Sequence, residues 1–185
     1  ERTGVLIFTN SFRIGGSERQ AVELIKRLDR RRFDVTVACF RRTGPLLEEL
    51  DGYVAEVHEF PLTAFHHPGT LRQAGRFAAL LRRAGPRIVQ CFDFYSNLFA
   101  IPLARLAGVP VVLASRRDEG TMRTRAQGRA ERLSFALATG LVVNAQVIKD
   151  RLLLRAGLRP ERVFVVPNGL DLARFDDRMR AAPAD

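Results

Sequence analysis

The fold is decided by residues 4–20, which read Gly4-Val-Leu-Ile-Phe-Thr-Asn-Ser-Phe-Arg-Ile-Gly-Gly-Ser-Glu-Arg-Gln20. The short apolar run 5–8 predicts a buried strand. Ser17 and Gln20 have the S-x-x-Q spacing of a capping box, which predicts that a helix begins there. Apolar residues at 21, 24, 25 and 28 then form one helical face. The stretch therefore predicts a strand, a glycine loop and a helix in direct succession.

The glycine loop between this strand and helix is a candidate anion site. Gly15 and Gly16 lack a Cβ that would hold a ligand away from the backbone. Backbone N–H groups and the helix dipole both favour an anion at a helix N-terminus. The alternative is an ordinary strand-to-helix turn. The loop has neither G-x-G-x-x-G nor G-K-[ST] spacing, so a dinucleotide fingerprint and a P-loop are both excluded.

Strand and helix patterns alternate along the whole chain. Strands are predicted at 5–8, 33–40, 53–60, 87–92, 109–115, 141–144 and 163–166. Helices are predicted from 17 and at 44–50, 68–84, 95–107, 125–138 and 145–156. Leu71, Ala74, Ala78 and Leu81 are the expected inward face of the helix at 68–84. This α/β alternation predicts a doubly wound parallel sheet of about seven strands with helices on both faces, which binds ligands beyond the carboxyl ends of its strands.

Composition is compatible with one domain of 185 residues, 46% of them hydrophobic. Cys39 and Cys91 each lie in or at the end of an apolar run without metal-ligand spacing, which predicts buried thiols in a reducing compartment. His58 and the adjacent His66 and His67 lack further ligands at suitable spacing. We therefore expect no metal site.

The chain carries a net charge of +10, and all its basic residues except Lys26 and Lys149 are arginine. No aromatic residues interleave with the arginines as they do in single-strand-binding proteins, so no nucleic-acid partner is expected. One cluster stands out: Arg116, Arg117, Arg123, Arg125, Arg129 and Arg132. It predicts either a solvated helix face or contact with an anionic acceptor or an anionic membrane surface. No apolar run is long enough to span a membrane, so we expect a cytoplasmic protein, with peripheral attachment to the inner membrane face as the alternative.

The segment 165–175, Val165-Val-Pro-Asn-Gly-Leu-Asp-Leu-Ala-Arg-Phe175, resembles the linker signature V-x-P-N-G-[VIL]-D-x-x-x-F of family 4 glycosyltransferases, which have the GT-B architecture. The segment from Gly15 to Glu18 is similar to the G-G-x-E loop of the same family. The segments 44–50, 87–92 and 107–111 also fit in order and spacing. The resemblance thus covers essentially the whole chain.

The resemblance implies a chain that is one half of a GT-B fold, in which two Rossmann-like domains face each other across a cleft. Residues 1–170 would form the N-terminal, acceptor-binding domain. Residues 171–185 would be the hinge and the start of a missing C-terminal, donor-binding domain. Asn168 and Gly169 resemble the inter-domain hinge, and a plain turn is the local alternative.

The implied chemistry moves a sugar, with retention, from a nucleotide-diphosphate sugar to an acceptor hydroxyl on a glycan or a lipid-linked molecule. It needs no metal or other cofactor, since charged side chains and backbone N–H groups stabilise the leaving phosphate. By this resemblance Gly15, Gly16, Ser17 and Glu18 belong to the donor and acceptor site, while the missing half holds most of the donor. Glu18 is alternatively a first-turn glutamate favoured by the helix dipole.

The chain departs from the family pattern where relatives carry histidines in the acceptor half. Arg116 stands near the place of one such histidine, and it cannot act as a base because its pKa is above 12. Arg116 and Arg117 would instead hold an anionic acceptor group. Asp93 and Asp118 are the candidate catalytic carboxylates. A salt bridge to a neighbouring arginine is the alternative for Asp118.

Two other functions stay open at this point. A nucleotide-sugar epimerase of the same architecture is one, although the linker and the G-G-S-E loop argue against it. The other is a stand-alone basic binding module or one subunit of a split transferase. Residues 1–185 alone are expected to be inactive, because the family's donor-binding half is not among them.

Overall fold

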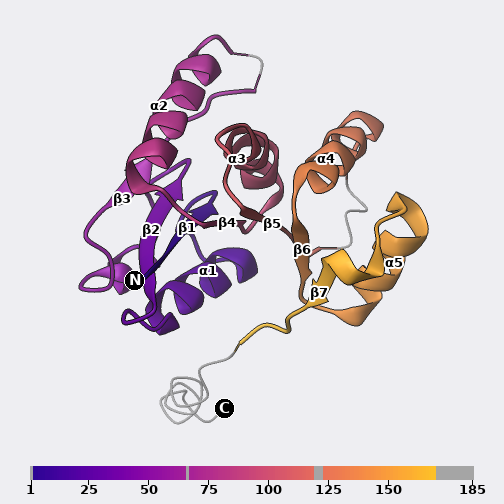
Figure 1. The fold of residues 1–185 in the computed structure, drawn as a ribbon, viewed down its shortest axis with the longest axis horizontal. Helices are drawn as coiled ribbons and strands as arrows, with labels where there is room; N and C mark the ends of the chain where they lie inside the picture. Colours follow the sequence, from indigo (N-terminus) through magenta and orange to yellow (C-terminus); the bar gives the residue numbers. More distant parts are fainter. Residues whose placement is uncertain (1, 66, 119–122, 170–185) are drawn as a thin grey trace, which may run out of the picture.

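The computed structural model describes residues 2–65, 67–118 and 123–169, and it has a seven-stranded parallel sheet at its centre (Figure 1). The strands are β1 (Thr3–Thr9), β2 (Phe33–Cys39), β3 (Val57–Glu59), β4 (Ile88–Cys91), β5 (Val111–Arg116), β6 (Gly140–Val143) and β7 (Val163–Val165). Their order in the sheet is β3-β2-β1-β4-β5-β6-β7. The predicted doubly wound fold is confirmed, with β1 at the switch point where the strand order reverses.

The helices divide unequally between the two faces of the sheet. They are α1 (Gly16–Arg27), α2 (Gly69–Ala84), α3 (Phe94–Leu106), α4 (Arg125–Leu137) and α5 (Gln146–Ala156). Figure 1 shows α1 below the sheet and α2, α3 and α4 above it. This follows from right-handed crossovers, because the chain moves one way along the sheet from β1 to β3 and the other way from β3 to β7.

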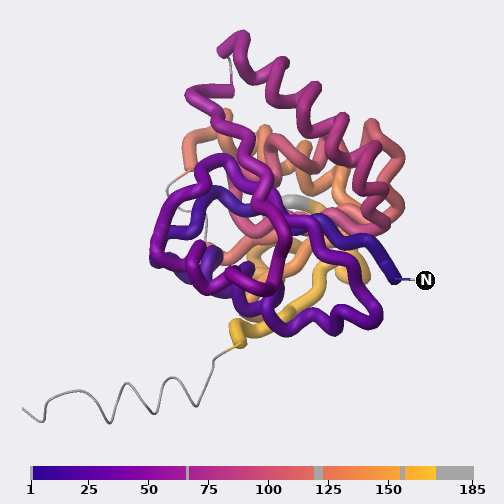
Figure 2. Tube along the Cα trace, turned by 90° about the vertical axis from the view of Figure 1, so that its left-hand side faces the viewer, coloured from indigo at the N-terminus to yellow at the C-terminus, as the bar shows by residue number. Residues whose placement is uncertain are grey.

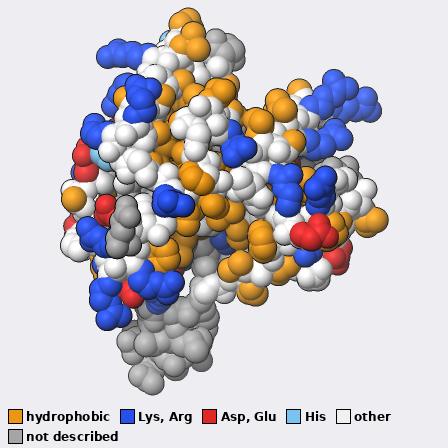
Figure 3. All heavy atoms as spheres, in the orientation of Figure 1, with side chains coloured by type: hydrophobic (Ala, Val, Ile, Leu, Met, Phe, Trp, Pro, Cys, Tyr) orange, Lys and Arg blue, Asp and Glu red, His pale blue; other side chains and the backbone are white. Residues whose placement is uncertain are grey.

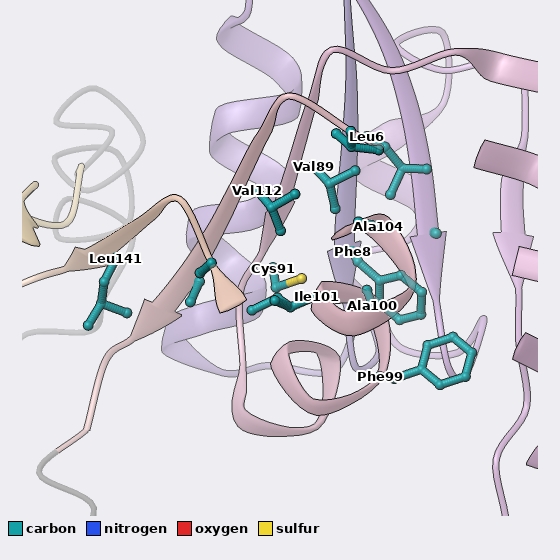
Figure 4. Close-up of a cluster of buried hydrophobic side chains, with 14 of the residues drawn as sticks. Leu6, Phe8, Val89, Cys91, Phe99, Ala100, Ile101, Ala104, Val112 and Leu141 are labelled. Atoms are coloured by element: carbon teal, nitrogen blue, oxygen red, sulfur yellow. The ribbon is translucent and has the colours of Figure 1, made fainter. Parts of the chain in front are cut away.

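Five phenylalanine rings form the centre of the core on the α2–α3 face. They are Phe8, Phe40, Phe60, Phe77 and Phe99. The ring of Phe8 lies 4.9 Å from that of Phe40 and 5.3 Å from that of Phe77, measured between centroids. Figure 4 shows side chains of the central strands meeting α3, where Ala100 and Ile101 lie close to Cys91. Both cysteines are buried, as predicted, and burial raises the pKa of the Cys39 thiol to about 12.

Two predicted elements near the β3 edge were wrong in extent. The predicted strand at 53–60 is only Val57–Glu59, because this edge strand pairs with β2 over three residues, from Val37 to Cys39. The predicted helix at 44–50 is a single 3₁₀ turn, Glu48–Leu50. Short apolar-rich segments at a sheet edge satisfy local patterns without having a partner of matching length.

The predicted inward face of α2 is confirmed in part. Leu81 is buried and Ala74 packs against the core, but Leu71 is 80% exposed. Phe77 and Leu80, which were not predicted to face inward, are buried as well. The first turn of α2 continues the loop that follows β3 and does not reach the core. That loop lies on the side of the molecule away from the N-terminus (Figure 2), where the strands end.

The boundary predicted at residues 170–171 and the segment 171–185 lie outside the described residues. Among residues 2–65, 67–118 and 123–169, no helix is long and apolar enough to cross a membrane.

Candidate functional site at the carboxyl edge of the sheet

The glycine loop after β1 leads directly into α1, but not through the predicted capping box. The helix starts at Gly16, its N-cap is Gly15 in an extended conformation, and no side chain caps it. A Cβ on Gly15 would lie 2.3 Å from Oε2 of Glu18, whereas a Cβ on Gly16 would meet nothing within 4 Å. The carboxylate of Glu18 therefore folds back against Gly15, while the surface at Gly16 is open to a ligand.

A second glycine, which the sequence analysis missed, holds this loop in place. Gly44 has φ +122°, and a Cβ there would lie 2.2 Å from the carbonyl of Phe12. The Phe12 amide donates to the Thr43 carbonyl, and the Phe12 carbonyl accepts from Leu46 N. Only glycine allows this close approach of two loops. The Gly44–Pro45 pair was the available signal in the sequence.

Gln20 makes a paired contact with the linker segment 149 positions along the chain. Its Nε2 donates to the Gly169 carbonyl at 2.7 Å, and its Oε1 accepts from the Gly169 amide at 2.8 Å. Nearby, Nη1 of Arg117 donates to Oδ1 of Asn168 at 2.7 Å. The structure thus brings together Arg117, Asn168 and Gly169, which the sequence proposed, and adds Gln20.

Arg117 also forms one wall of a cavity of about 630 Å³ on the α1 face of the sheet. Its guanidinium lies 5.0 Å from the centroid of the Phe92 ring, and burial lowers the pKa of Arg117. Leu24 of α1 and Phe164 of β7 line the cavity with it. Figure 3 shows hydrophobic side chains gathered between α1 and β7 on this side.

We expect Gln20→Leu, which keeps the volume but loses both hydrogen bonds, to release the linker. Each bond contributes about 1 kcal/mol, so loss of both should quicken exchange of the Gly169 amide with deuterium about thirtyfold. Hydrogen exchange measured by NMR tests this. The control is Gln73→Leu, at a partly exposed glutamine whose Oε1 accepts from Arg76 within the same helix. Equal exchange at Gly169 in the wild type and in Gln20→Leu would contradict the contact.

Asp93, a candidate catalytic residue, is the N-cap of α3. Its Oδ1 accepts from the amides of Tyr95 and Ser96, each at 3.0 Å, in a reciprocal capping box with Ser96. Its Oδ2 is buried and has no hydrogen-bond partner among the described residues. Burial is the main cause that raises the pKa of Asp93 to about 6, and the charge of Glu18 contributes to the same shift. We call Asp93 and Glu18, whose carboxylate lies against Gly15, the acidic pair.

The raised pKa of Asp93 predicts that the free energy of unfolding depends on pH. A folded-state pKa near 6 against 3.8 unfolded stabilises the fold below pH 3.8, and this contribution is lost as the pH rises through 6. The loss amounts to about 2–3 kcal/mol. We expect Asp93→Asn, which keeps the capping oxygen, to lack this loss between pH 4 and 6. Urea unfolding at several pH values measures it, with exposed Asp34→Asn as control, and superimposable pH profiles of Asp93→Asn and wild type would contradict it.

Arg116, Asp118, Arg123 and Glu131 form a network of ion pairs after β5. Nη1 of Arg116 and Nη1 of Arg123 each lie 3.2 Å from a carboxylate oxygen of Glu131, which is only 3% exposed. Arg123 also donates to both carboxylate oxygens of Asp118, at 3.0 and 3.1 Å. The salt-bridge alternative for Asp118 is thereby confirmed. The predicted arginine cluster divides, since Arg116 and Arg123 are paired internally.

Asn97 fixes the start of this network, and the sequence analysis missed it. Its Nδ2 donates to the Ser115 carbonyl at 2.8 Å, and its Oδ1 accepts from the Ser115 amide at 3.2 Å. Its own carbonyl accepts from Oγ of Ser134 at 2.7 Å. The signal in the sequence was an asparagine in a mostly apolar predicted helix. Asn97 is fully buried in the structure, and a buried amide has to find hydrogen-bond partners. Asn97 thus fixes the backbone of β5 at Ser115, directly before Arg116 and Arg117.

In the described part of the chain, no three His, Cys, Asp or Glu side chains converge as metal ligands would. Ser17 is partly exposed in the first turn of α1, next to Gly16. The site is therefore made of backbone N–H groups, arginines, amides and one acidic pair at the carboxyl edge of the sheet.

The sequence profile of the family described as Glycosyltransferase Family 4 matches residues 14–174. The chain belongs to this family. The match includes both the glycine loop and the linker that Gln20 joins. A comparison with curated proteins finds no match.

Solved structures share the fold of this family 4 chain at low identity. The structure of Anabaena Alr3699/HepE in complex with UDP and glucose is similar with a TM-score of 0.76 and 17% identity, over 93% of this chain and 46% of that one. The lipopolysaccharide outer core galactosyltransferase WaaB has a TM-score of 0.71 and 14% identity, over 91% and 46%. The UDP-GlcNAc 2-epimerase from Neisseria meningitidis has 0.65 and 15%, over 90% and 46%. The chain thus spans less than half the length of these structures.

Proposed function

We propose that this chain is the acceptor-binding half of a retaining glycosyltransferase that takes its sugar from a nucleotide-diphosphate sugar. The observation that supports this most is the paired contact of Gln20 with Gly169. It places the glycine loop and the linker on one edge of the sheet, where a second domain would face them. Family membership supports the reaction type, and the UDP-glucose bound to Anabaena HepE supports the donor class.

In the proposed reaction the acceptor hydroxyl oxygen bonds to the anomeric carbon as the bond from that carbon to the diphosphate breaks, and the hydroxyl proton passes to an oxygen of the leaving diphosphate. Backbone N–H groups at Gly16 and the start of α1 stabilise the charge of the leaving diphosphate. The acidic pair of Glu18 and Asp93 orients the acceptor hydroxyl beside Gly15. No metal takes part in this proposal.

Gly16 allows a direct test in the full-length protein that contains this chain. Gly16→Val adds a side chain where the fold leaves open space, so it should fold but block the diphosphate. We expect release of UDP from UDP-sugars in the presence of acceptor to fall about a hundredfold, and a chelator to leave the wild-type rate unchanged. Gly75→Val, in equally open space on α2, is the matched control.

Two outcomes would overturn the proposal. One is that the full-length protein releases no nucleoside diphosphate from any nucleotide sugar in a panel. The other is that it converts UDP-GlcNAc to its 2-epimer, as the architecture of the epimerase neighbours permits.

The outer face of α4 supports a proposed contact with an anionic membrane at the cytoplasmic surface. Arg125, Arg129 and Arg132 are all exposed along one side of the helix. Leu133 and Leu137 continue that side and are 64% and 36% exposed. Figure 3 shows basic side chains gathered over α4 at the upper right. Arginines above exposed leucines suit the interface of an anionic bilayer.

Replacing Arg125, Arg129 and Arg132 by serine is expected to weaken sedimentation with vesicles containing about 30% anionic lipid by at least tenfold, at about 1 kcal/mol for each arginine. The matched control replaces Arg82, Arg83 and Arg105, which are also exposed and change the net charge equally. If both triple variants lose binding equally, then net charge explains it and α4 does not dock.

A further inference from the structure

Two large aromatic rings stand half exposed at the carboxyl edge of the sheet, outside the groups discussed so far. Phe65 is 41% exposed and Tyr95 is 47% exposed. Their ring centroids are 6.2 Å apart, and their planes differ by only 19°. The two rings are thus nearly parallel and offset. Exposed aromatic rings in such an arrangement offer an apolar surface that the fold itself does not use.

Both rings are held in place by their own elements. Tyr95 lies in the first turn of α3, where its amide donates to Oδ1 of Asp93 at 3.0 Å. The Phe94 ring packs edge-on against it at 5.2 Å, and the guanidinium of Arg123 lies 4.8 Å from the centroid of the Phe94 ring.

Phe65 lies in the loop that precedes α2, and a turn fixes its backbone. The Ala64 carbonyl accepts from the His67 amide at 3.1 Å and from Oγ1 of Thr70 at 2.8 Å. The platform of Phe65 and Tyr95 is therefore formed, without any ligand, by two separate segments: the loop before α2 and the first turn of α3. Preorganised rings lose little conformational freedom on binding.

We propose that the platform of Phe65 and Tyr95 binds a pyranose ring of the acceptor by stacking. One face of a pyranose presents C–H groups, whose positive edges are attracted to the negative face of an aromatic ring. The tyrosine hydroxyl at the platform's rim meets the sugar's hydroxyl edge. This rests on the proposed transferase function, and it deepens it by naming a sugar ring as the part of the acceptor bound on this domain.

The surroundings favour a sugar over a lipid chain. A lipid chain needs a continuous apolar groove. The large apolar cavity lies under α1, and neither Phe65 nor Tyr95 lines it. Asp93, a member of the acidic pair, lies two residues before Tyr95 and accepts a hydrogen bond from its amide. A small apolar platform beside hydrogen-bonding groups suits an amphipathic ring.

The absence of tryptophan from the sequence makes a direct binding test possible. Tyr95→Trp places the only tryptophan of the variant's sequence in the platform. Tyr53→Trp places the same probe at an equally exposed tyrosine, 45% exposed, on the turn after Leu50 and away from the loops of the platform. The probes are methyl glucoside and methyl galactoside, titrated to about 100 mM, and phosphatidylcholine vesicles. Adding Phe65→Ala to Tyr95→Trp removes half the platform.

The expected result is a saturable fluorescence change with at least one methyl glycoside in Tyr95→Trp, weakened at least fivefold by Phe65→Ala and absent from Tyr53→Trp. No saturable change with either glycoside would overturn the proposal, as would a response to vesicles alone, which would assign the platform to lipid. The readout requires no turnover. A missing sugar response alongside normal sugar transfer by the full-length protein would therefore overturn the platform and leave the transferase proposal intact.

Discussion

Phe8→Ala is expected to lower the free energy of unfolding by about 4 kcal/mol. Phe8 is fully buried on β1, and its ring contacts four others: Phe40, Phe60, Phe77 and Phe99. Truncation removes the apolar contact and leaves a cavity that the rings directly after β2 and β3 and those on α2 and α3 cannot fill. Urea unfolding followed by circular dichroism measures the change in free energy.

The control for this experiment is Phe164→Ala, because Phe164 is 50% exposed at the outer strand β7. Loss of the Phe164 ring should lower the free energy of unfolding by about 1 kcal/mol. A cost for Phe8→Ala no greater than that of Phe164→Ala would mean that the phenylalanine cluster relaxes to fill the space.

Glu131→Gln is expected to destabilise the fold by about 3 kcal/mol. Glu131 is 3% exposed and pairs with Arg116 and Arg123, whose side chains are only 15% and 13% exposed. Burial raises the pKa of Glu131, while the two arginines lower it. A neutral glutamine leaves two partly buried guanidinium groups facing each other with Asp118 as their shared anion. The loop between β5 and α4 should loosen as a result.

The control is Glu161→Gln, an exposed glutamate in the turn before β7, which should change stability by less than about 0.5 kcal/mol. A second readout is cleavage by trypsin after Arg116, Arg117 and Arg123, which should quicken in Glu131→Gln. If Glu131→Gln unfolds at the wild-type urea concentration and resists trypsin equally, the network contributes nothing to order in this loop.

The strands were predictable wherever both faces of the sheet are covered. Leu141 and Val143 face one side and Val142 the other, and all three are buried, so the run reads as apolar throughout. The edge strand β3 was not predictable in extent, because the apolar residues 53–55 read as part of the strand but have no partner on β2. Leu71 was assigned inward because periodicity shows which residues share a helix face but not where along its length a helix meets the core.

The site was predictable where a motif specified it and not where distant segments meet. Gly15, Gly16, Asn168 and Gly169 followed from motifs at the two ends of the chain. Gln20 satisfied the local spacing of a capping box, yet its amide bonds to Gly169 instead. Local spacing carries no information on a competing partner 149 positions away. Asp93 was noticed for its charge, but its capping of α3 depended on Ser96, three residues later.

The position of β1 in the middle of the sheet has a consequence for synthesis on the ribosome. One edge of β1 pairs with β2, which is made soon afterwards, but the other edge must wait for β4, from Ile88. During that interval a growing chain presents an open edge of a strand whose residues 5–8 are all apolar, and such edges recruit other chains. Ribosome-bound chains stopped before residue 88 should therefore crosslink to chaperones, and chains extended past β4 should cease to do so.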